Sequence, residues 1–459
     1  MLMSILRSLL ILSAVSVGVT AGGWPIQHRE TDVVIIGGGS SGTYAATRLT
    51  RMGHDVVVIE KSDHLGGHAN TYVDPASGTP INVGVQVFEN TSIVLAHFAD
   101  LGVPVFPVPN TNQPVVNLDF TRGAAVPNYT PLTGEQISTA LSAYATILAT
   151  NYLYLVDGFN LPDPVPHELL QPFGEFAEKH GLQDMVFVCS TYEQPEETWK
   201  QPTLYVFVNL RASLVEAIIG PSNLVTTTDV NALYRSAAEL LGSKVIYNST
   251  AAKVRRSENG VMVTANSPTG KIRIKAKKLL FATYPVPENL AGWDLRPEDL
   301  EVFAKFRPKS YFDGVISSPG LNGSLAYQNI GTHTPFNIPR LPGVLSLGPT
   351  GFSDGSHLAY VGSNTVISSD RGKALLVDQL DTLSKHGLVG GGDVTFKAWW
   401  DHTPFKLQVS TEDIAAGFYR DLYGLQGVKS TYWTGATFQA QDSSMVWAYA
   451  ESLLANLTA

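Results

Sequence analysis

The segment from Thr31 to Leu49 constrains the fold more than any other part of this chain. It reads as a buried strand ending at Ile36, a glycine-rich turn and the first turns of a helix. In such a turn the first glycine allows a sharp reversal, the second lets the backbone approach a pyrophosphate, and the third lets the helix pack against the strand. The residues of the turn predicted to bind phosphate are Gly37, Gly39, Ser40, Ser41 and Gly42.

A second apolar strand, Val56 to Ile59, ends in Glu60. A glycine motif of this kind is weak evidence when it stands alone. Here a carboxylate follows the turn by roughly 20 residues, where it can bond both hydroxyls of an adenosine ribose. The sequence therefore predicts a dinucleotide site, and the alternative is a turn that binds no nucleotide.

Two adjacent glycines, Gly66 and Gly67, follow the predicted ribose carboxylate and precede His68. They suggest a loop pressed against a phosphate or a flat ring. We predict that both glycines, His68 and Lys61 contact the cofactor. The alternative is an ordinary turn with a solvated histidine.

Composition limits the class of protein. A chain of 459 residues with 44% hydrophobic residues is long enough for two or three globular domains. The formal charge of −9 leaves no basic face for nucleic acid. Cys189 is the single cysteine, so an internal disulfide and a zinc–thiolate site are excluded, and no metal site is predicted.

Residues 1–21 have the pattern of a secretory signal, with Arg7 before an apolar core and Val19-Thr-Ala21 as a small-residue cleavage site. The alternative is an uncleaved anchor, although the apolar core is short for a membrane span. We expect a secreted or lumenal glycoprotein with no stable membrane span after removal of the signal. The candidate glycosylation sites are Asn90, Asn128, Asn248, Asn322 and Asn456.

The rest of the chain mixes helical and strand patterns. Apolar stripes predict helices over Gln136 to Leu155 and over Pro202 to Ile219, and Asp229 reads as the N-cap of a helix ending at Leu241. Further patterns predict an edge-like strand from Lys271 to Lys275, a separate buried strand beginning at Lys278, and a final helix from Ser443 to Leu457.

Four separated segments together resemble the FAD-dependent amine oxidase superfamily, and within it the β-cyclopiazonate dehydrogenase-like flavoproteins of fungi. They are Val34-Ile-Ile-Gly-Gly-Gly-Ser-Ser-Gly, Glu60 with Leu65-Gly-Gly-His68, Ala282-Thr-Tyr-Pro, and Tyr432-Trp-Thr-Gly-Ala with Asp442-Ser-Ser444.

The resemblance implies a mixed α/β fold (α+β overall). A Rossmann-like FAD-binding domain would comprise residues 30–75, 224–288 and 403–459. An interleaved substrate-binding domain, with an antiparallel sheet and helices, would comprise residues 76–223 and 289–402.

The resemblance also implies where FAD would lie. The adenine would lie near the backbone of Val254, and Gly435 would admit the second side of the diphosphate. Asp442, Ser443 and Ser444 would place the N-terminus of the last helix against the flavin pyrimidine, where reduced flavin gathers negative charge. The family's C-terminal covalent cysteine is missing, so FAD is expected to be non-covalent.

Other departures concern catalysis. The position of an aromatic residue that helps to cage an amine falls at Met445, and the position of an acidic residue falls at Thr437. Lys305 and Lys309 are candidates for the lysine that bridges water to the flavin, or are surface lysines. Trp399 and Trp400 are adjacent in a strand, so at most one lines a cavity. The predicted catalytic and wall residues are Lys309, Trp399, Trp400, Tyr432 and Met445.

The resemblance predicts an oxidoreductase that takes a hydride from a C–N bond, or from an activated C–C or C–O bond, of an organic metabolite. Oxygen or another acceptor would reoxidise the flavin. Three alternatives stay open: an FAD-containing isomerase or cyclase, an inactive FAD-binding protein, and an NAD(P) dehydrogenase.

Overall fold

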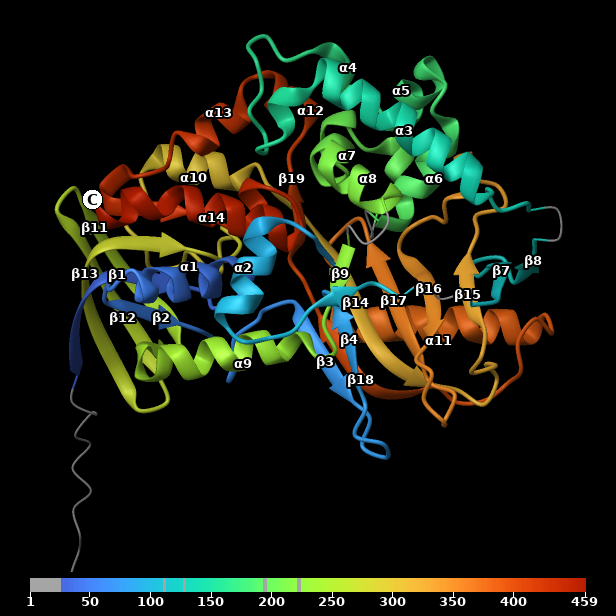
Figure 1. Cartoon of the computed structure of the whole chain (residues 1–459), viewed down its shortest axis with the longest axis horizontal. Helices are drawn as coiled ribbons and strands as arrows, with labels where there is room; N and C mark the ends of the chain where they lie inside the picture. The colour runs from blue at the N-terminus through green and yellow to red at the C-terminus, as the bar shows by residue number, and fades with distance from the viewer. Residues whose placement is uncertain (1–25, 110–112, 127–128, 193–195, 221–223) are drawn as a thin grey trace, which may run out of the picture.

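A computed structural model describes residues 26–109, 113–126, 129–192, 196–220 and 224–459. Two large β-sheets lie side by side, and a layer of helices lies above the second sheet (Figure 1). This arrangement confirms the predicted mixed α/β class. The predicted signal segment, residues 1–21, and the predicted glycosylation site Asn128 lie outside the described residues.

The first sheet is built from strands far apart in the sequence, in the order β10-β2-β1-β13-β12-β11 with β20 beside β13. Strands β1, β2, β10, β13 and β20 pair in parallel, and β11 to β13 form an antiparallel meander. These strands come from all three segments of the predicted FAD-binding domain. The exact domain boundaries stay a prediction. The bounds are β1 Gln27–Ile36, β2 Val56–Ile59, β10 Val245–Ile246, β11 Thr250–Ser257, β12 Gly260–Ser267, β13 Gly270–Phe281 and β20 Thr431–Trp433.

Strand β13 corrects two predictions. The segment Lys271 to Lys275 is not a separate edge strand, because it is continuous with the buried segment after Lys278 in one strand of 12 residues. That strand has β1 on one side and β12 and β20 on the other. Its charged residues alternate with buried ones, so they mark a solvated face of the sheet rather than its edge.

Four helices share one apolar core with the first sheet. Helix α1 packs against α14 and α9, and α2 packs against α14. Asp229 caps α9 as predicted, because its carboxylate accepts a hydrogen bond from the Asn231 N–H at 2.9 Å. The bounds are α1 Ser40–Arg51, α2 Ser92–Asp100, α9 Val230–Leu241 and α14 Ser443–Thr458.

The second sheet has the order β18-β14-β17-β16-β15-β7-β8, with β19 beside β14, and is antiparallel except where β15 meets β7. Leucines of helix α11, Ser369–Lys385, join its core. The bounds are β7 Val115–Asp119, β8 Ala124–Ala125, β14 Arg307–Ser317, β15 Ala326–Asn329, β16 Gly343–Pro349, β17 His357–Ser363, β18 Thr395–Asp401 and β19 Phe405–Gln408.

The helical layer differs from its sequence pattern at one place. The apolar stripe from Pro202 to Ile219 is two helices, α7 Thr203–Asn209 and α8 Ala212–Ile219. The break at Arg211 puts its backbone in an extended conformation and buries its side chain. The first stripe forms α3, Gly134–Asn151, and the layer also contains α4 His167–Leu170, α5 Phe173–His180 and α6 Gln183–Tyr192.

Smaller elements connect these units. Strands β3, Ala69–Val73, and β4, Pro80–Gly84, form a hairpin-like pair, and β9, Leu224–Thr226, lies between β5, Phe88–Glu89, and β6, Phe106–Pro107. Three short helices complete the fold: α10 Pro297–Ala304 packs against α13 Phe418–Tyr423, and α12 Thr411–Ala415 packs against α13 and α4.

Candidate active site

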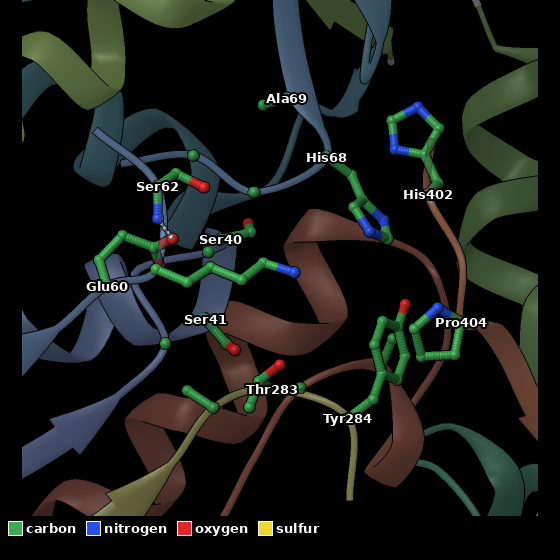
Figure 2. A pocket seen from close by; sticks show the side chains of 18 of the residues that line it. Ser40, Ser41, Glu60, Ser62, His68, Ala69, Thr283, Tyr284, His402 and Pro404 are labelled. Carbon is green, nitrogen blue, oxygen red and sulfur yellow. Dashed lines mark hydrogen bonds between the residues drawn. The ribbon is translucent and has the colours of Figure 1, made fainter. Parts of the chain in front are cut away.

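A cavity of about 450 Å³ runs along the end of the first sheet, within the range typical of small-molecule sites. It begins at the glycine turn after β1 and passes the Gly66-Gly67 loop. It ends among His68, Tyr284 and His402 (Figure 2). The site therefore brings together segments from the start, middle and end of the chain.

The glycine turn after β1 leaves the N-terminus of α1 open to the cavity. Gly37 has a φ of +101°, and a Cβ on Gly42 would lie 2.0 Å from the Gly37 carbonyl oxygen, so both positions need glycine. No side chain caps α1, and its first turn contains no acidic residue. Uncapped N–H groups at a helix N-terminus are suited to bind a phosphate.

Glu60 lies at the end of β2 with its carboxylate fixed. The backbone N–H of Gly38 donates to Oε2 at 2.6 Å, and that of Ser62 donates to Oε1 at 2.8 Å. The carboxylate is buried and still lines the cavity. Each oxygen keeps a lone pair for a further donor, which suits a pair of ribose hydroxyls.

The second glycine loop lies directly against the first. Gly66 N–H donates to the Gly38 carbonyl at 2.9 Å, and Gly39 and Gly66 form a β-bridge. A Cβ on Gly67 would lie 3.0 Å from the Gly39 Cα. The absence of side chains at Gly39 and Gly67 keeps a flat groove open between Glu60 and the far end of the cavity.

The C-terminal element closes the cavity. Gly435, Thr437, Asp442 and Ser443 line it, and α14 begins at Ser443 as predicted. Asp442 caps that helix, because its carboxylate accepts from the Met445 N–H at 2.9 Å. The positive end of the α14 dipole therefore lies next to the negative charge of its capping carboxylate, Asp442.

A buried arginine compensates that carboxylate. Arg211 Nη2 is 3.4 Å from Asp442 Oδ1 and donates to Ser444 Oγ at 2.9 Å, and it forms an ion pair with Glu89. The Ser444 hydroxyl lies within this cluster rather than in the cavity wall. Ser444 therefore belongs to the layer behind the cavity.

At the end of the cavity opposite Glu60, aromatic and imidazole side chains gather (Figure 2). The ring centroids of His68 and His402 are 4.6 Å apart, and those of His68 and Tyr284 are 6.0 Å apart. Gln441 Nε2 donates to the Tyr284 hydroxyl at 3.0 Å, and burial raises the pKa of Tyr284 to about 12. Tyr284 is therefore a neutral phenol near neutral pH.

The two adjacent tryptophans point to opposite faces, as the strand geometry predicted. Trp400 lines the cavity, whereas Trp399 stacks on Phe312 and donates from Nε1 to Ser369 Oγ at 3.1 Å. The prediction that at most one of them lines a cavity is confirmed. Trp399 itself lies in the core of the second sheet, away from the site.

Lys309, Tyr432 and Met445 also lie away from the cavity wall. Lys309 forms an ion pair with the buried Glu196, and the alternative, Lys305, lies 3.3 Å from Asp413. Tyr432 packs in β20, and Met445 joins the core while its neighbour Val446 lines the cavity. Neighbouring positions on a helix face different directions, which is why the choice of Met445 missed the wall by one residue.

The backbone of Val254 is already paired. Its N–H donates to the Gly292 carbonyl at 3.4 Å, and its carbonyl accepts from the Asp294 N–H at 3.3 Å. The residues of this region that line the cavity are Ser249, Thr250 and Ala251, at the start of β11. The wall expected near the adenine is therefore three or more residues earlier than the sequence placed it.

Several residues of the site carried no sequence signal. His402 follows β18 in a segment without a motif, and Asp313 and Arg211 are single charged residues within apolar runs. Only folding of the second sheet and the helical layer onto the first sheet brings these residues near the cavity. Tyr284 was part of the recognised Ala282-Thr-Tyr-Pro segment, although its role was not predicted.

The residues present fit FAD. An open helix N-terminus, a fixed carboxylate and two touching glycine loops supply sites for diphosphate and ribose, and the cavity continues beyond them into an aromatic end. A dinucleotide with a planar ring system has that succession of charged and flat parts.

Comparisons with known proteins agree with this geometry. The chain is 36% identical over 439 residues to the FAD-dependent oxidoreductase dpchF of Colletotrichum higginsianum, covering 91% of each chain. It is 34% identical over 441 residues to the beta-cyclopiazonate dehydrogenase of Aspergillus oryzae, covering 94% of each chain. The chain belongs to the FAD-dependent oxidoreductases. A family model described as an NAD(P)-binding Rossmann-like domain also matches residues 35–101.

Solved structures place the fold of this FAD-dependent oxidoreductase. A fatty acid isomerase from P. acnes superimposes with a TM-score of 0.73 at 20% identity, covering 93% of this chain and 98% of that one. A putrescine oxidase variant superimposes with a TM-score of 0.67 at 15% identity, covering 94% and 99%. The oxidoreductase thus shares the amine oxidase-like fold. Among its described residues no helix is long and apolar enough to cross a membrane.

Proposed function

We propose that this oxidoreductase binds FAD without a covalent bond and oxidises a C–N bond, or an activated C–C or C–O bond, of an organic secondary metabolite. The observation that carries this proposal is the continuous cavity from Glu60, past the two glycine loops, to the aromatic end at Tyr284 and Trp400. FAD, when bound, supplies a hydride acceptor at N5, and oxygen or another acceptor takes the electrons onward.

The residues of the chain would bind the cofactor and orient the substrate against it. Glu60 would hold the ribose hydroxyls, and the N–H groups at the start of α1 would hold the diphosphate. Gly39, Gly67 and Gly435 leave room for the cofactor backbone. Trp400 and Tyr284 would form the apolar wall that excludes water from the reacting carbon.

Cys189 supports non-covalent binding. It is the single cysteine of the chain and is buried in α6 of the helical layer, where it does not line the cavity. Acid precipitation of purified protein tests this point. Yellow flavin in the supernatant, identified as FAD, is the expected result, and flavin retained in the pellet would contradict it.

An anaerobic screen tests the activity. Candidate metabolites are added to the FAD-loaded protein, and bleaching of the flavin absorbance identifies a substrate. Product and hydrogen peroxide are then quantified after air is admitted. A protein that binds FAD and is bleached by no metabolite of a broad screen would favour the reading as an inactive FAD-binding protein.

A second candidate is an isomerase or cyclase that uses FAD without net redox turnover. The structural similarity to the fatty acid isomerase motivates it. Such an enzyme would convert substrate without peroxide or any reduced acceptor, whereas an oxidase would form one peroxide per product.

We also propose passage through the secretory pathway. Besides the signal pattern of residues 1–21, four of the predicted glycosylation sites are exposed: Asn90, Asn248, Asn322 and Asn456. Expression in a eukaryotic host should yield a chain whose N-terminus begins after Ala21 and whose mass falls on glycosidase treatment. An intact N-terminus in a protein retained in the cytosol would contradict this.

A further inference from the structure

A carboxylate and an imidazole are buried together behind the far end of the cavity. Asp313 Oδ2 lies 2.9 Å from His402 Nε2, and the two side chains are 0% and 2% exposed. Among the described residues neither Asp313 oxygen nor His402 Nε2 has a hydrogen-bond partner of regular geometry. The contact therefore places a buried carboxylate beside a group that can carry the opposite charge.

This pair lies at the end of the cavity opposite Glu60, where His402 lines the wall. Asp313 lies on β14 and His402 follows β18, so both belong to the second sheet, whereas Glu60 and the glycine loops belong to the first. Buried charges in a protein core are costly, and those without a structural partner network point to a functional use.

His68 lies beside His402 in the cavity wall. Its ring meets that of His402 edge to face, at 4.6 Å and 68°, and it lines the cavity beside Tyr284 (Figure 2). Burial lowers the pKa of His68 well below its usual value, and the nearby charges of His402 and Lys61 act in the same direction. A lower pKa extends the pH range in which His68 is neutral and able to accept a proton.

The other titratable groups here do not fill that role. The phenols of Tyr284 and Tyr311 stay protonated, because burial raises the pKa of each, in Tyr311 with the charge of Asp313 as a further cause. Glu60 lies at the opposite end of the cavity, beside the first glycine turn. His68 is thus the neutral base at this end of the cavity.

We propose that His68 accepts the proton that the substrate releases on oxidation, and that the Asp313–His402 ion pair is the positioning unit that keeps His68 unprotonated. This inference deepens the proposed function and rests on it. The substrate class is a metabolite with an O–H or N–H group on the carbon that gives up hydride, with an apolar body that fits the aromatic wall.

The C–H bond breaks with its electron pair, which leaves as hydride to the oxidised flavin. The O–H or N–H bond breaks, its electron pair forms the new C=O or C=N bond, and its proton forms an N–H bond on His68. The substrate thus loses two electrons and two hydrogens, and His68 returns its proton to solvent before the next turnover.

Labelling by diethyl pyrocarbonate tests the charge state of His68 without any turnover. The reagent modifies neutral imidazole, and mass spectrometry of FAD-loaded protein labelled between pH 5 and 8 follows His68. His64 lies in the same proteolytic peptide on the exposed surface and serves as an internal reference. In the wild type, the labelling of His68 should reach its half-maximum at a lower pH than that of His64.

Two variants test the positioning pair. His402→Gln removes the positive charge beside His68 and leaves the carboxylate of Asp313, so the pH of half-maximal labelling of His68 should rise. Asp313→Asn removes the opposing negative charge of the pair instead, so the midpoint should change less in that variant. Asp119→Asn, in a buried carboxylate on β7 bonded to Thr332, is the matched control and should leave the midpoint unchanged.

The outcomes separate this inference from the proposed function. A His68 midpoint equal to that of His64 in the wild type, or no rise of the midpoint in His402→Gln, overturns it even if Asp313→Asn fails to fold. Once the screen gives a substrate, His68→Gln should bleach at least tenfold more slowly than the wild type at equal FAD occupancy, with recovery as pH rises. Protein that binds no FAD at all would instead defeat the proposed function.

Discussion

The Arg211 guanidinium donates to Ser444 Oγ at 2.9 Å, joining the break between α7 and α8 to the first turn of α14. Arg211 is 6% exposed, and its ion pair with Glu89 is buried as well. This contact fixes the helical layer to the helix start that lines the cavity. Loss of Arg211 would leave the carboxylate of Glu89 buried without a cation, which is energetically costly.

Arg211→Met should lower the free energy of unfolding by about 3–5 kcal/mol, because Glu89 and Asp442 then lose their buried cation. Urea unfolding at a fixed excess of FAD measures it. The double variant Arg211→Met with Glu89→Gln should recover much of the loss. Arg235→Met, at an ion pair whose arginine is 62% exposed, is the control and should cost under about 1 kcal/mol. Equal losses for Arg211 and Arg235 would contradict the buried-charge argument.

Glu60→Gln should weaken FAD binding by about 10- to 100-fold, which corresponds to the roughly 1.5–3 kcal/mol of a hydrogen bond to a charged group. Titration of the apoprotein with FAD, followed by quenching of flavin fluorescence, gives the dissociation constant. Glu30→Gln changes an exposed carboxylate on the same sheet and should leave that constant unaltered. Unchanged binding in Glu60→Gln would remove the ribose role from this residue.

Gly42→Ala should abolish FAD binding or prevent folding, because the added Cβ would meet the Gly37 carbonyl at 2.0 Å. Gly134→Ala is the matched control, since nothing lies within 4 Å of a Cβ there at the start of α3. That control should raise the free energy of unfolding by up to about 1 kcal/mol. Thermal unfolding and flavin content of both variants check the pair.

Stability should fall as pH drops from 6.5 to about 4, with His97 as one cause. Burial lowers the pKa of His97 to about 4, and its two ring nitrogens are without hydrogen-bond partners among the described residues. Because the folded-state pKa is depressed, the unfolded chain binds the extra proton in this window, so the contribution is complete above pH 6.5 and lost below it. The loss would be about 3 kcal/mol at most.

The variant His97→Phe should flatten the dependence of unfolding free energy on pH in that window, as measured by urea unfolding at several pH values. His28→Gln, at an exposed histidine on β1, should keep the slope of the wild type. A slope unchanged in His97→Phe would show that other groups control acid stability.

Local patterns predicted the first two strands and several helix starts well, although they divided β13 into two strands. The strand before Gly37, the strand before Glu60, the Asp229 cap and the start of the last helix depend on neighbours within a few residues, which a sequence displays directly. The roles of the glycines in the turn after β1 could also be predicted, because their spacing is typical of a turn in which a side chain would clash.

The far end of the cavity could not be predicted in this way. Only the packing of the second sheet decides that Trp400, and not Trp399, lines the cavity. Lys309 pairs with Glu196, which lies more than a hundred positions away in the sequence. The cavity wall lies three to five residues before Val254 and one residue after Met445, since a motif fixes a segment more closely than it fixes which residue faces inward. The Asp313–His402 pair has no local pattern at all.

Gly435 and Ser443 line the same cavity as Gly37 and Ser41, although they are separated by almost the whole chain. The two halves of the cofactor cradle therefore meet where α14 packs against α1. Flavin content should accordingly report on that helix–helix contact, even in variants whose altered residues lie outside the cavity wall.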